Sequence, residues 1–273
     1  MKATKKIVGA ACALVAAVAL SAGSTFAWFS QSGTVSATGM NVKAATSKNI
    51  LISNANGDGA TWNTTAATTD NAVKELTPSS TVNGTDFFYV SNPETIDYSA
   101  GTSGVGTVFA ATTSDTTSGK TYVASYTFYV KADGVDGTTY DKLFVSNIAV
   151  TRATETANQS NVSMALRVSV SYQASGAASA TTFIYAPVSG YSQTQGVKEA
   201  GTVAADALNA QKDSVTITTA YSNAANLGKV TTIATAVTIR VWYEGEDAAC
   251  TSANALTVEQ LGIAVSLSAA DNT

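Results

Sequence analysis

Hydrophobic and polar residues alternate with a period of two in many short runs along this chain, and clusters of Gly, Asn, Asp, Ser and Thr separate the runs. Such alternation predicts β-strands with one buried face, and the clusters predict the turns between them. The large apolar residues share one face in Tyr122–Val130 and in Val237–Tyr243, and neither run contains proline. Long strands without proline suit central positions in two packed antiparallel sheets.

After residue 46, the alternation predicts strands at Lys48–Ser53, Phe87–Val90, Gly104–Ala110, Thr121–Lys131, Leu143–Thr151, Val162–Tyr172, Thr182–Ala186, Ser214–Thr219, Thr231–Tyr243 and Leu261–Ser268. Helical patterns are confined to Thr202–Gln211 and Thr257–Gln260. Neither a fixed repeat nor a proline-rich linker divides the chain. We therefore predict one all-β domain over residues 46–273, an antiparallel β-sandwich with short helical insertions.

The first strand-like run, Thr34–Ala45, changes phase at Gly39. The apolar residues of one phase are Val35 and Ala37, and those of the other are Met40, Val42 and Ala44. A glycine between the two sets can host a bulge or a bend. We therefore expect two separate strand pieces on either side of Gly39.

An export signal precedes this run. Lys2, Lys5 and Lys6 form a basic start, and the apolar stretch Ile7–Leu20 follows. Thr25-Phe26-Ala27 then places small residues where a signal peptidase requires them, which predicts a signal peptide over residues 1–27, cleavage between Ala27 and Trp28, and secretion. A retained membrane anchor is the alternative, but a spanning helix needs roughly 20 apolar residues and this stretch is shorter. We expect no membrane attachment after cleavage.

Composition narrows the classes of partner and chemistry. Cleavage removes three lysines and no acid, so a formal net charge of −4 becomes −7, which argues against a nucleic-acid partner. The chain has no histidine, so it cannot supply a Ser-His-Asp triad or a His-Glu-x-x-His zinc site. Cys250 is the one cysteine left after cleavage, so an intramolecular disulfide is excluded in the mature chain.

Two groups of polar residues are candidates for chemistry. Asn56–Gly59 and Asp133–Gly137 carry oxygen ligands that suit calcium, although Asx-Gly pairs are also the usual residues of tight hairpin turns, which we favour. A second group surrounds Trp242 and consists of Arg240, Glu244, Glu246 and Asp247. We interpret these acids as a solvated loop with one neighbouring arginine pair. We therefore expect no catalytic site, no bound metal, no cofactor and no enzyme activity.

The N-terminal motif resembles that of a known family. The stretch Thr25-Phe26-Ala27-Trp28-Phe29-Ser30, followed by Ser36-Ala37-Thr38-Gly39-Met40-Asn41-Val42, is similar to the TasA/camelysin family of exported proteins from Gram-positive bacteria. The matching positions are Ala27 before the cut, Phe29 near the mature terminus, Gly39, and the hydrophobic Met40 and Val42. Later, Ala165–Val168 and Arg240–Gly245 look like strands of related jelly-roll proteins.

The resemblance implies a jelly-roll fold, secretion, and assembly into extracellular, biofilm matrix fibres in which the N-terminal segment of one subunit completes a sheet of the next. Some members are described as metallopeptidases, an activity that a chain without histidine does not support. The implied assembly segment spans residues 28–45 and uses Phe29, Val35, Ala37, Gly39, Met40 and Val42. The expected partner is another copy of the chain, with the cell surface or matrix components as further candidates. The alternative function is a monomeric cell-surface module that binds a glycan or calcium.

Overall fold

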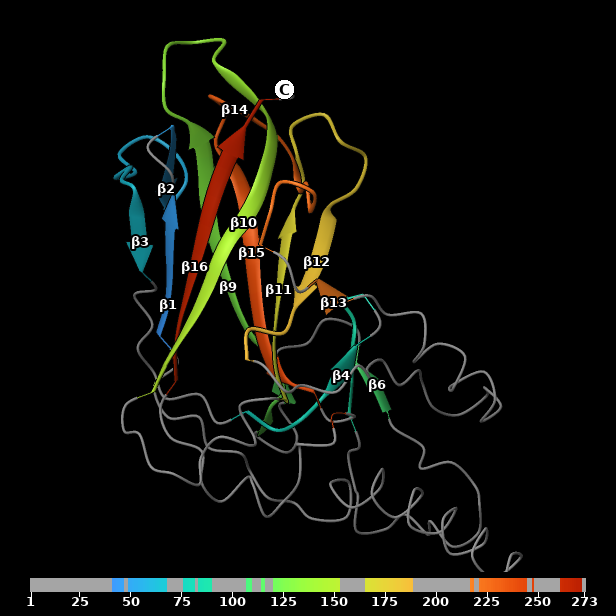
Figure 1. Ribbon diagram of the computed structural model, residues 1–273. Coiled ribbons are helices and arrows are strands. Elements are labelled where there is room, and N and C mark those ends of the chain that lie inside the picture. The colour runs from blue at the N-terminus through green and yellow to red at the C-terminus, as the bar shows by residue number, and fades with distance from the viewer. Residues whose placement is uncertain are drawn as a thin grey trace, which may run out of the picture.

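Two β-sheets that face each other make up most of the protein in the computed structural model (Figure 1). The structure describes residues 41–46, 49–67, 76–81, 83–89, 107–109, 114–115, 120–152, 165–188, 217–218, 221–244, 247 and 261–271. The sequence-based prediction of an all-β, sandwich-like protein is confirmed for this part of the chain, which contains almost no helix. The two predicted helical segments lie outside the described residues.

The first sheet has five strands, in the order β14 (Gly228–Thr231), β10 (Thr139–Arg152), β16 (Leu261–Ala270), β1 (Asn41–Thr46) and β3 (Thr65–Ala67). Neighbouring strands are antiparallel except β1 and β16, which run parallel from Asn41↔Gly262 to Thr46↔Leu267. The register of β10 against β16 shifts between Val145 and Asn147. Such a β-bulge increases the local twist of the sheet.

The second sheet has six strands, in the order β13 (Ile217–Thr218), β12 (Thr181–Tyr185), β11 (Leu166–Tyr172), β15 (Thr235–Tyr243), β9 (Ala124–Ala132) and β2 (Ile50–Ser53). Its pairs are antiparallel except the short contact between β12 and β13. The predicted long strands β9 and β15 lie side by side in its interior, as expected for strands without proline.

Two small sheets complete the described structure. One contains β4 (Ser80–Thr81), β5 (Phe87–Tyr89) and β6 (Thr107–Phe109), and the other contains β7 (Ser114–Asp115) and β8 (Lys120–Thr121). The strands β4 and β6 lie at the lower end of the sandwich in Figure 1. The alternation does not predict β3, β4, β7 or β8 as separate strands, because they are too short to show a period, and it misses β14 apart from Thr231. Each predicted run after residue 46 contains a strand.

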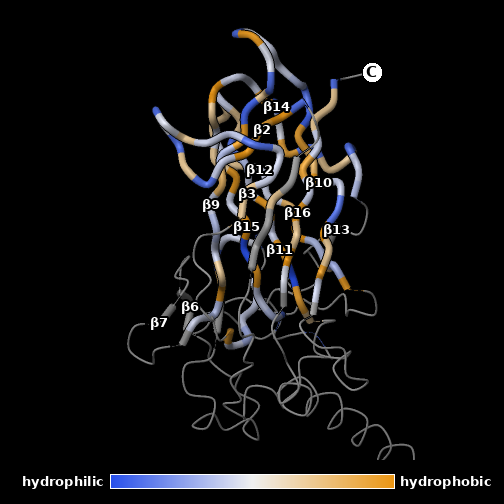
Figure 2. Tube along the Cα trace, turned by 90° about the vertical axis from the view of Figure 1, so that its left-hand side faces the viewer, coloured by the Kyte–Doolittle hydropathy of each residue, from blue (hydrophilic) through white to orange (hydrophobic). Residues whose placement is uncertain are grey.

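The main core lies between the two large sheets. On β9 the predicted face is buried from Ala124 through Val130, and on β15 Val237, Ile239 and Val241 are fully buried. Complete burial of one Val, Ile or Phe side chain stabilises the fold by roughly 1.5–3 kcal/mol. Figure 2 shows hydrophobic residues recurring along these strands.

Strand β11 departs from the alternating pattern, because all seven of its residues are buried. Its inward face joins the main core, whereas Arg167, Ser169 and Ser171 point to the other face of the sheet. A second, smaller core covers that face with Phe87, Tyr122, Val123, Ile184 and Trp242. The rings of Phe87 and Trp242 meet edge to face with centroids 5.1 Å apart. The sandwich therefore has a partial third layer at its lower end.

Candidate functional sites

Strand β1 is the part of the predicted assembly segment that the structure describes. Its backbone fills the position between β16 and β3, where Val42 pairs with Ile263 and Ala44 pairs with Val265. The side chain of Ala44 is fully buried in the main core. Val42, which the family resemblance places in the segment that pairs with a neighbouring subunit, pairs inside its own chain in this structure.

The structure does not describe the other residues predicted for cleavage and assembly, namely Ala27, Trp28, Phe29, Val35, Ala37, Gly39 and Met40. Because β1 is parallel to β16, the chain enters β1 at the end of the sheet where β16 begins. Three residues, Ser47–Asn49, separate the end of β1 from the start of β2 in the opposite sheet.

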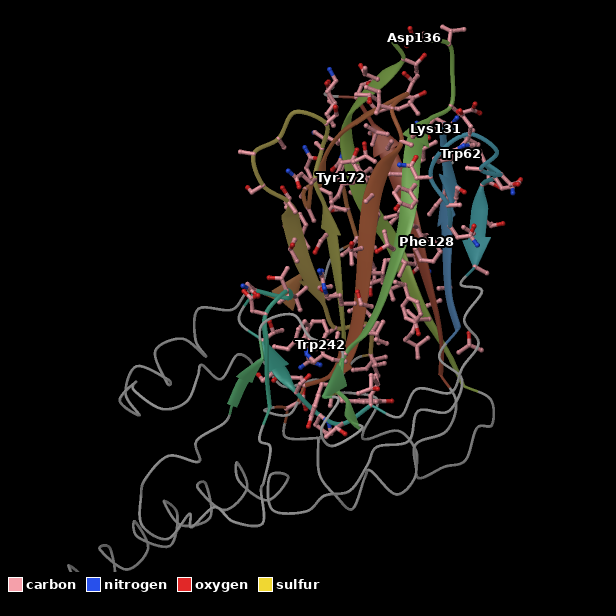
Figure 3. All side chains as sticks on the ribbon, turned by 180° about the vertical axis from the view of Figure 1, so that it is seen from behind. Trp62, Phe128, Lys131, Asp136, Tyr172 and Trp242 are labelled. Carbon is pink, nitrogen blue, oxygen red and sulfur yellow. The ribbon has the colours of Figure 1, made fainter. Side chains whose placement is uncertain are left out.

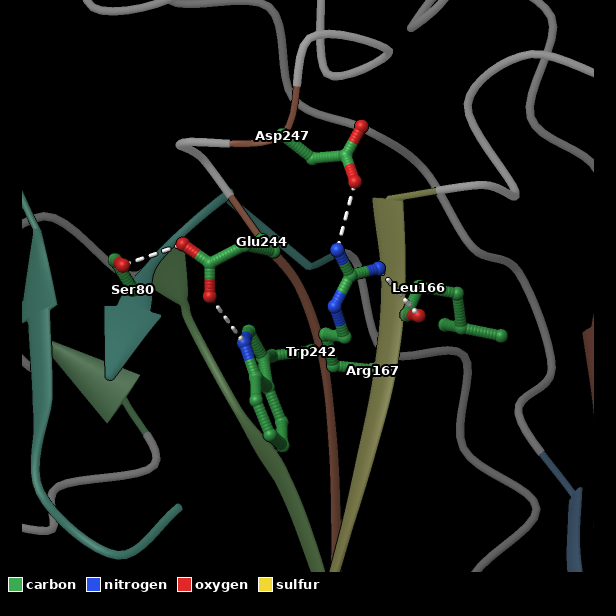
Figure 4. A network of polar contacts seen from close by, with 6 residues as sticks. All are labelled: Ser80, Leu166, Arg167, Trp242, Glu244 and Asp247. Atoms are coloured by element: carbon green, nitrogen blue, oxygen red, sulfur yellow. Dashed lines mark hydrogen bonds and ion pairs between the residues drawn. The ribbon is translucent and has the colours of Figure 1, made fainter. Parts of the chain in front are cut away.

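A buried polar network lies at the lower end of the sandwich, where β4, β11 and β15 meet (Figure 4). The carboxylate of Glu244 accepts hydrogen bonds from the Ser80 hydroxyl and, at 3.2 Å, from Nε1 of Trp242. Nη2 of Arg167 lies 2.7 Å from Oδ2 of Asp247, and both side chains are almost completely buried. These contacts join segments that lie far apart in the sequence.

The network corrects the interpretation of the acids near Trp242. We predicted a solvated loop, but Glu244 has 0% and Asp247 has 3% of its surface exposed. The arginine that pairs with Asp247 is Arg167, from the neighbouring strand, rather than Arg240. The remaining member, Glu246, lies outside the described residues.

Arg240 has a different role on the outer face of the six-stranded sheet. Its Nη1 donates a hydrogen bond of 3.1 Å to Oγ of Ser171. Burial lowers the pKa of Arg240, and the nearby charge of Asp86 partly offsets that shift. Because a guanidinium stays charged in proteins, Arg240 remains a fixed cation on this face.

The chemistry of the buried network favours a structural role. A buried carboxylate needs donors, which Ser80 and Trp242 supply, and a buried guanidinium needs acceptors, which Asp247 and the carbonyl of Leu166 supply. Backbone hydrogen bonds reinforce the same junction, since Ser79 N donates to Tyr243 O and Glu244 N donates to Ala165 O. The network therefore fastens β4 to the ends of β11 and β15.

An open part of the outer face lies toward the opposite end of the same sheet (Figure 3). Nζ of Lys131 sits 4.4 Å from the ring centroid of Trp62, which is a cation–π contact. Tyr129 points to the same face as Lys131, because the two residues are separated by one position on β9. All three side chains are partly exposed, so aromatic surface and a positive charge lie together in contact with solvent.

The Asx-Gly loops are turns. Gly57, Gly59 and Gly137 have φ angles of 110°, 93° and 91°, in the left-handed region that favours glycine. The first loop folds β2 back so that Ile52 bridges Asn63, as expected for a hairpin-like turn. The second loop was expected as a hairpin, but it connects β9 in one large sheet with β10 in the other. A turn signal does not specify which sheet the next strand joins.

Among the residues that the structure describes, no group of three or more His, Cys, Asp or Glu residues is arranged to hold a metal ion. No helix within the same described ranges is both long and apolar enough to cross a membrane. Comparison of the chain with protein-family models, with curated proteins and with solved structures found no match.

Two features of these sites escaped the sequence analysis. Arg167 and Asp247 are separated by 80 positions, so no local pattern links them. The covering of β11 by a second core was equally hidden, because Arg167, Ser169 and Ser171 at alternate positions are typical of a strand face open to solvent. The stretches Ala165–Val168 and Arg240–Gly245 overlap the strands β11 and β15.

Proposed function

We propose that this chain is a secreted structural subunit of extracellular matrix fibres, such as those of a biofilm, and that subunits join by exchange of an N-terminal strand. The observation that carries the proposal is the place of β1, the first described strand, between β16 and β3. The chain on its N-terminal side contains a further strand-like piece, Thr34–Thr38. A subunit of this kind brings both an N-terminal strand and sheets to which strands can be added.

Physical chemistry explains why such a strand can join two subunits. An unpaired sheet edge exposes backbone donors and acceptors, and an extended segment from another chain satisfies them while its alternate side chains fill apolar grooves. The contact is heterologous, because the donor surface differs from the acceptor surface, and repeated contacts of this type produce a filament.

The phase change at Gly39 separates two strand pieces, to which we give different roles. Residues after Gly39, from Asn41 onward, form β1 within their own chain. We therefore assign donation to the piece before Gly39, with Val35 and Ala37 as the side chains that enter the next subunit. A bend at the glycine lets the donated piece leave the sheet in which β1 is paired.

The sequence resemblance supports the same conclusion. The export signal, the cleavage motif at Ala27 and Trp28, and the Gly39-Met40-x-Val42 motif are similar to those of TasA/camelysin proteins. We propose a jelly-roll connection of the strands and a location outside the cell, at its surface, on that basis. The all-β sandwich is compatible with both proposals.

Electron microscopy of negatively stained protein tests the proposal. Mature protein that begins at Trp28 should form filaments, and protein without residues 28–38 should stay monomeric with an unchanged circular dichroism spectrum. Val35→Asp should reduce filament yield strongly, because it places a charge in an apolar groove. Ser32→Asp adds the same charge in the polar gap and should leave the yield unchanged.

A third variant separates assembly from folding. Ala44→Asp places a charge from β1 in the main core, so it should lower the free energy of unfolding of the monomer by several kcal/mol. Filaments that persist without residues 28–38 would refute the proposal that subunits donate an N-terminal strand to each other. Unfolding of the monomer by Val35→Asp would instead assign that residue to the core of its own subunit.

A monomeric surface module that binds a glycan is the second candidate, and the partly exposed Trp62, Tyr129 and Lys131 favour it. Aromatic rings offer apolar faces to sugar rings, and a cation offers hydrogen bonds to their oxygens. Glycan-array binding that is lost in Trp62→Ala, together with an absence of filaments, would favour this function over fibre assembly.

A further inference from the structure

We propose that Asn56 is a site of spontaneous deamidation and that Asn83 is protected from the same reaction by the fold. These are the two asparagines of the chain that precede glycine. An Asn-Gly step is chemically susceptible because glycine has no side chain to hinder attack by its backbone nitrogen. The structure surrounds the two steps in opposite ways.

The reaction needs a free backbone amide and a mobile side chain. The nitrogen of the glycine loses its proton to solvent base and attacks Cγ of the asparagine, and the side-chain nitrogen leaves as ammonia. The resulting succinimide takes up one water molecule at either carbonyl and opens to aspartate or isoaspartate. The net change is the exchange of an amide for a carboxylate, with one water consumed and one ammonia released.

Asn56 meets both requirements. Asn56 and Gly57 are exposed, and within the described residues no hydrogen bond holds the Asn56 side chain or the Gly57 amide nitrogen. The carbonyl of Gly57 accepts a hydrogen bond of 3.2 Å from Ala60 N, and this bond does not involve the Gly57 nitrogen. A Cβ built at Gly57 meets nothing within 4 Å, so the surroundings are open.

Asn83 meets neither requirement. Its Oδ1 accepts hydrogen bonds from the backbone nitrogens of Thr85, at 2.9 Å, and Asp86, at 2.8 Å, while its Nδ2 donates to Asp86 Oδ2 at 2.7 Å. The nitrogen of Gly84 is buried and donates to Oγ1 of Thr81 at 2.9 Å. Both the attacking nitrogen and the carbon under attack are therefore held in place.

Deamidation at Asn56 has a structural consequence. This loop returns the chain so that Asn63 pairs with Ile52, which covers the outer edge of β2. Isoaspartate inserts an additional backbone carbon into the turn, and either product adds a negative charge two residues from Asp58. The deamidated protein therefore has an altered turn and a weaker bridge between Asn63 and the edge strand β2.

Peptide mapping by mass spectrometry tests the proposal on the mature chain incubated at mildly alkaline pH. The hydrogen bonds of Asn83 and of the Gly84 nitrogen must break before the reaction can occur there. Asn56 should therefore deamidate at least about tenfold faster than Asn83, which corresponds to a difference of about 1.4 kcal/mol in activation free energy. The same protein in denaturant should lose this difference, because both steps share the Asn-Gly sequence. Thr81→Val, which removes the acceptor for Gly84 N, should raise the rate at Asn83 in the folded protein.

Equal rates at the two asparagines in the folded protein would overturn the proposal. A difference that persists in denaturant would do the same, because it would then come from the local sequence and not from the fold.

Discussion

At the scale of single residues, the buried pair of Arg167 and Asp247 stabilises the fold only if its geometry is good. Two charges removed from water cost several kcal/mol each, and their attraction offsets this only when the geometry is good. The 2.7 Å contact and the additional bond from Nη1 of Arg167 to the carbonyl of Leu166 meet that condition. The pair therefore holds the segment around Asp247 in one arrangement against β11.

Arg167→Leu should lower the free energy of unfolding by about 3–5 kcal/mol, because it leaves the Asp247 carboxylate buried beside an apolar side chain. Urea denaturation followed by circular dichroism measures the change. The double variant Arg167→Leu with Asp247→Leu should recover most of the loss, since it removes both charges. A single variant as stable as the parent, or a double variant no better than the single one, would show that the pair does not stabilise the junction.

At the scale of elements, the loop Asn83–Asp86 lies against the outer face of β11. Oγ of Ser169 donates a 2.8 Å hydrogen bond to the carbonyl of Gly84. A Cβ added to Gly84 would lie 2.9 Å from Cβ of Ser169, and the φ angle of Gly84 is 73°. Glycine is therefore required here for two reasons, close approach and a left-handed backbone.

Gly84→Ala should lower the free energy of unfolding by roughly 2–5 kcal/mol, because alanine disfavours the left-handed backbone and its methyl group overpacks against β11. Gly57→Ala is the matched control, because its φ is also positive but its surroundings are open. That variant should cost only about 1–2 kcal/mol. Thermal and urea unfolding of the two variants give the comparison, and equal losses would mean that the loop does not pack tightly on Ser169.

The sequence predicted elements better than their environment. The alternation in Tyr122–Val130 and Val237–Tyr243 is a local property, so β9, β15 and their buried faces were predicted correctly. The exception is Tyr122, which precedes β9 and lies in the second core. Ser169 contacts Gly84, 85 positions before it, and Arg167 contacts Asp247, 80 positions after it. No periodicity within β11 reveals the burial of these two residues. Strand β4, with two residues, is set by its contacts with Glu244 and β5.

The same limit applies to the candidate sites. Local chemistry identified the glycine turns at Asn56–Gly59 and Asp133–Gly137, because positive φ is a property of single residues. The solvated-loop interpretation of Glu244 and Asp247 was wrong, because burial of a charge depends on a partner such as Arg167 that only the tertiary fold supplies.

At the scale of the whole molecule, the described edges of the two large sheets are short or covered. The four edge strands are β14, β3, β13 and β2. Strand β14 has four residues, β3 has three and β13 has two, while β2 is bridged by Asn63. Short and covered edges reduce uncontrolled pairing between copies. Pairing between subunits, as proposed above, would then join a dedicated N-terminal segment to an acceptor edge, rather than join two sheet edges directly.

The parallel pairing of β1 with β16 has a mechanical consequence. Asn41 lies beside Gly262 near the start of β16, whereas Ala270 lies at its far end. Tension applied through Asn41 and Ala270 therefore acts along both strands and loads their hydrogen bonds together. By contrast, Lys142 and Ala270 face each other across β10 and β16, so tension through those two residues opens the bonds one after another.

Single-molecule pulling should give a clearly higher unfolding force through residues 41 and 270 than through residues 142 and 270, because forced unfolding follows the height of the unfolding barrier in the direction of the load. Equal forces would show that the parallel pair bears no load. In the fibre proposed above, tension passing through the N-terminal segments would enter β1 at Asn41. The shear geometry of β1 and β16 would then let β1, the strand next to the proposed joint, resist stretching better than the pair β10 and β16.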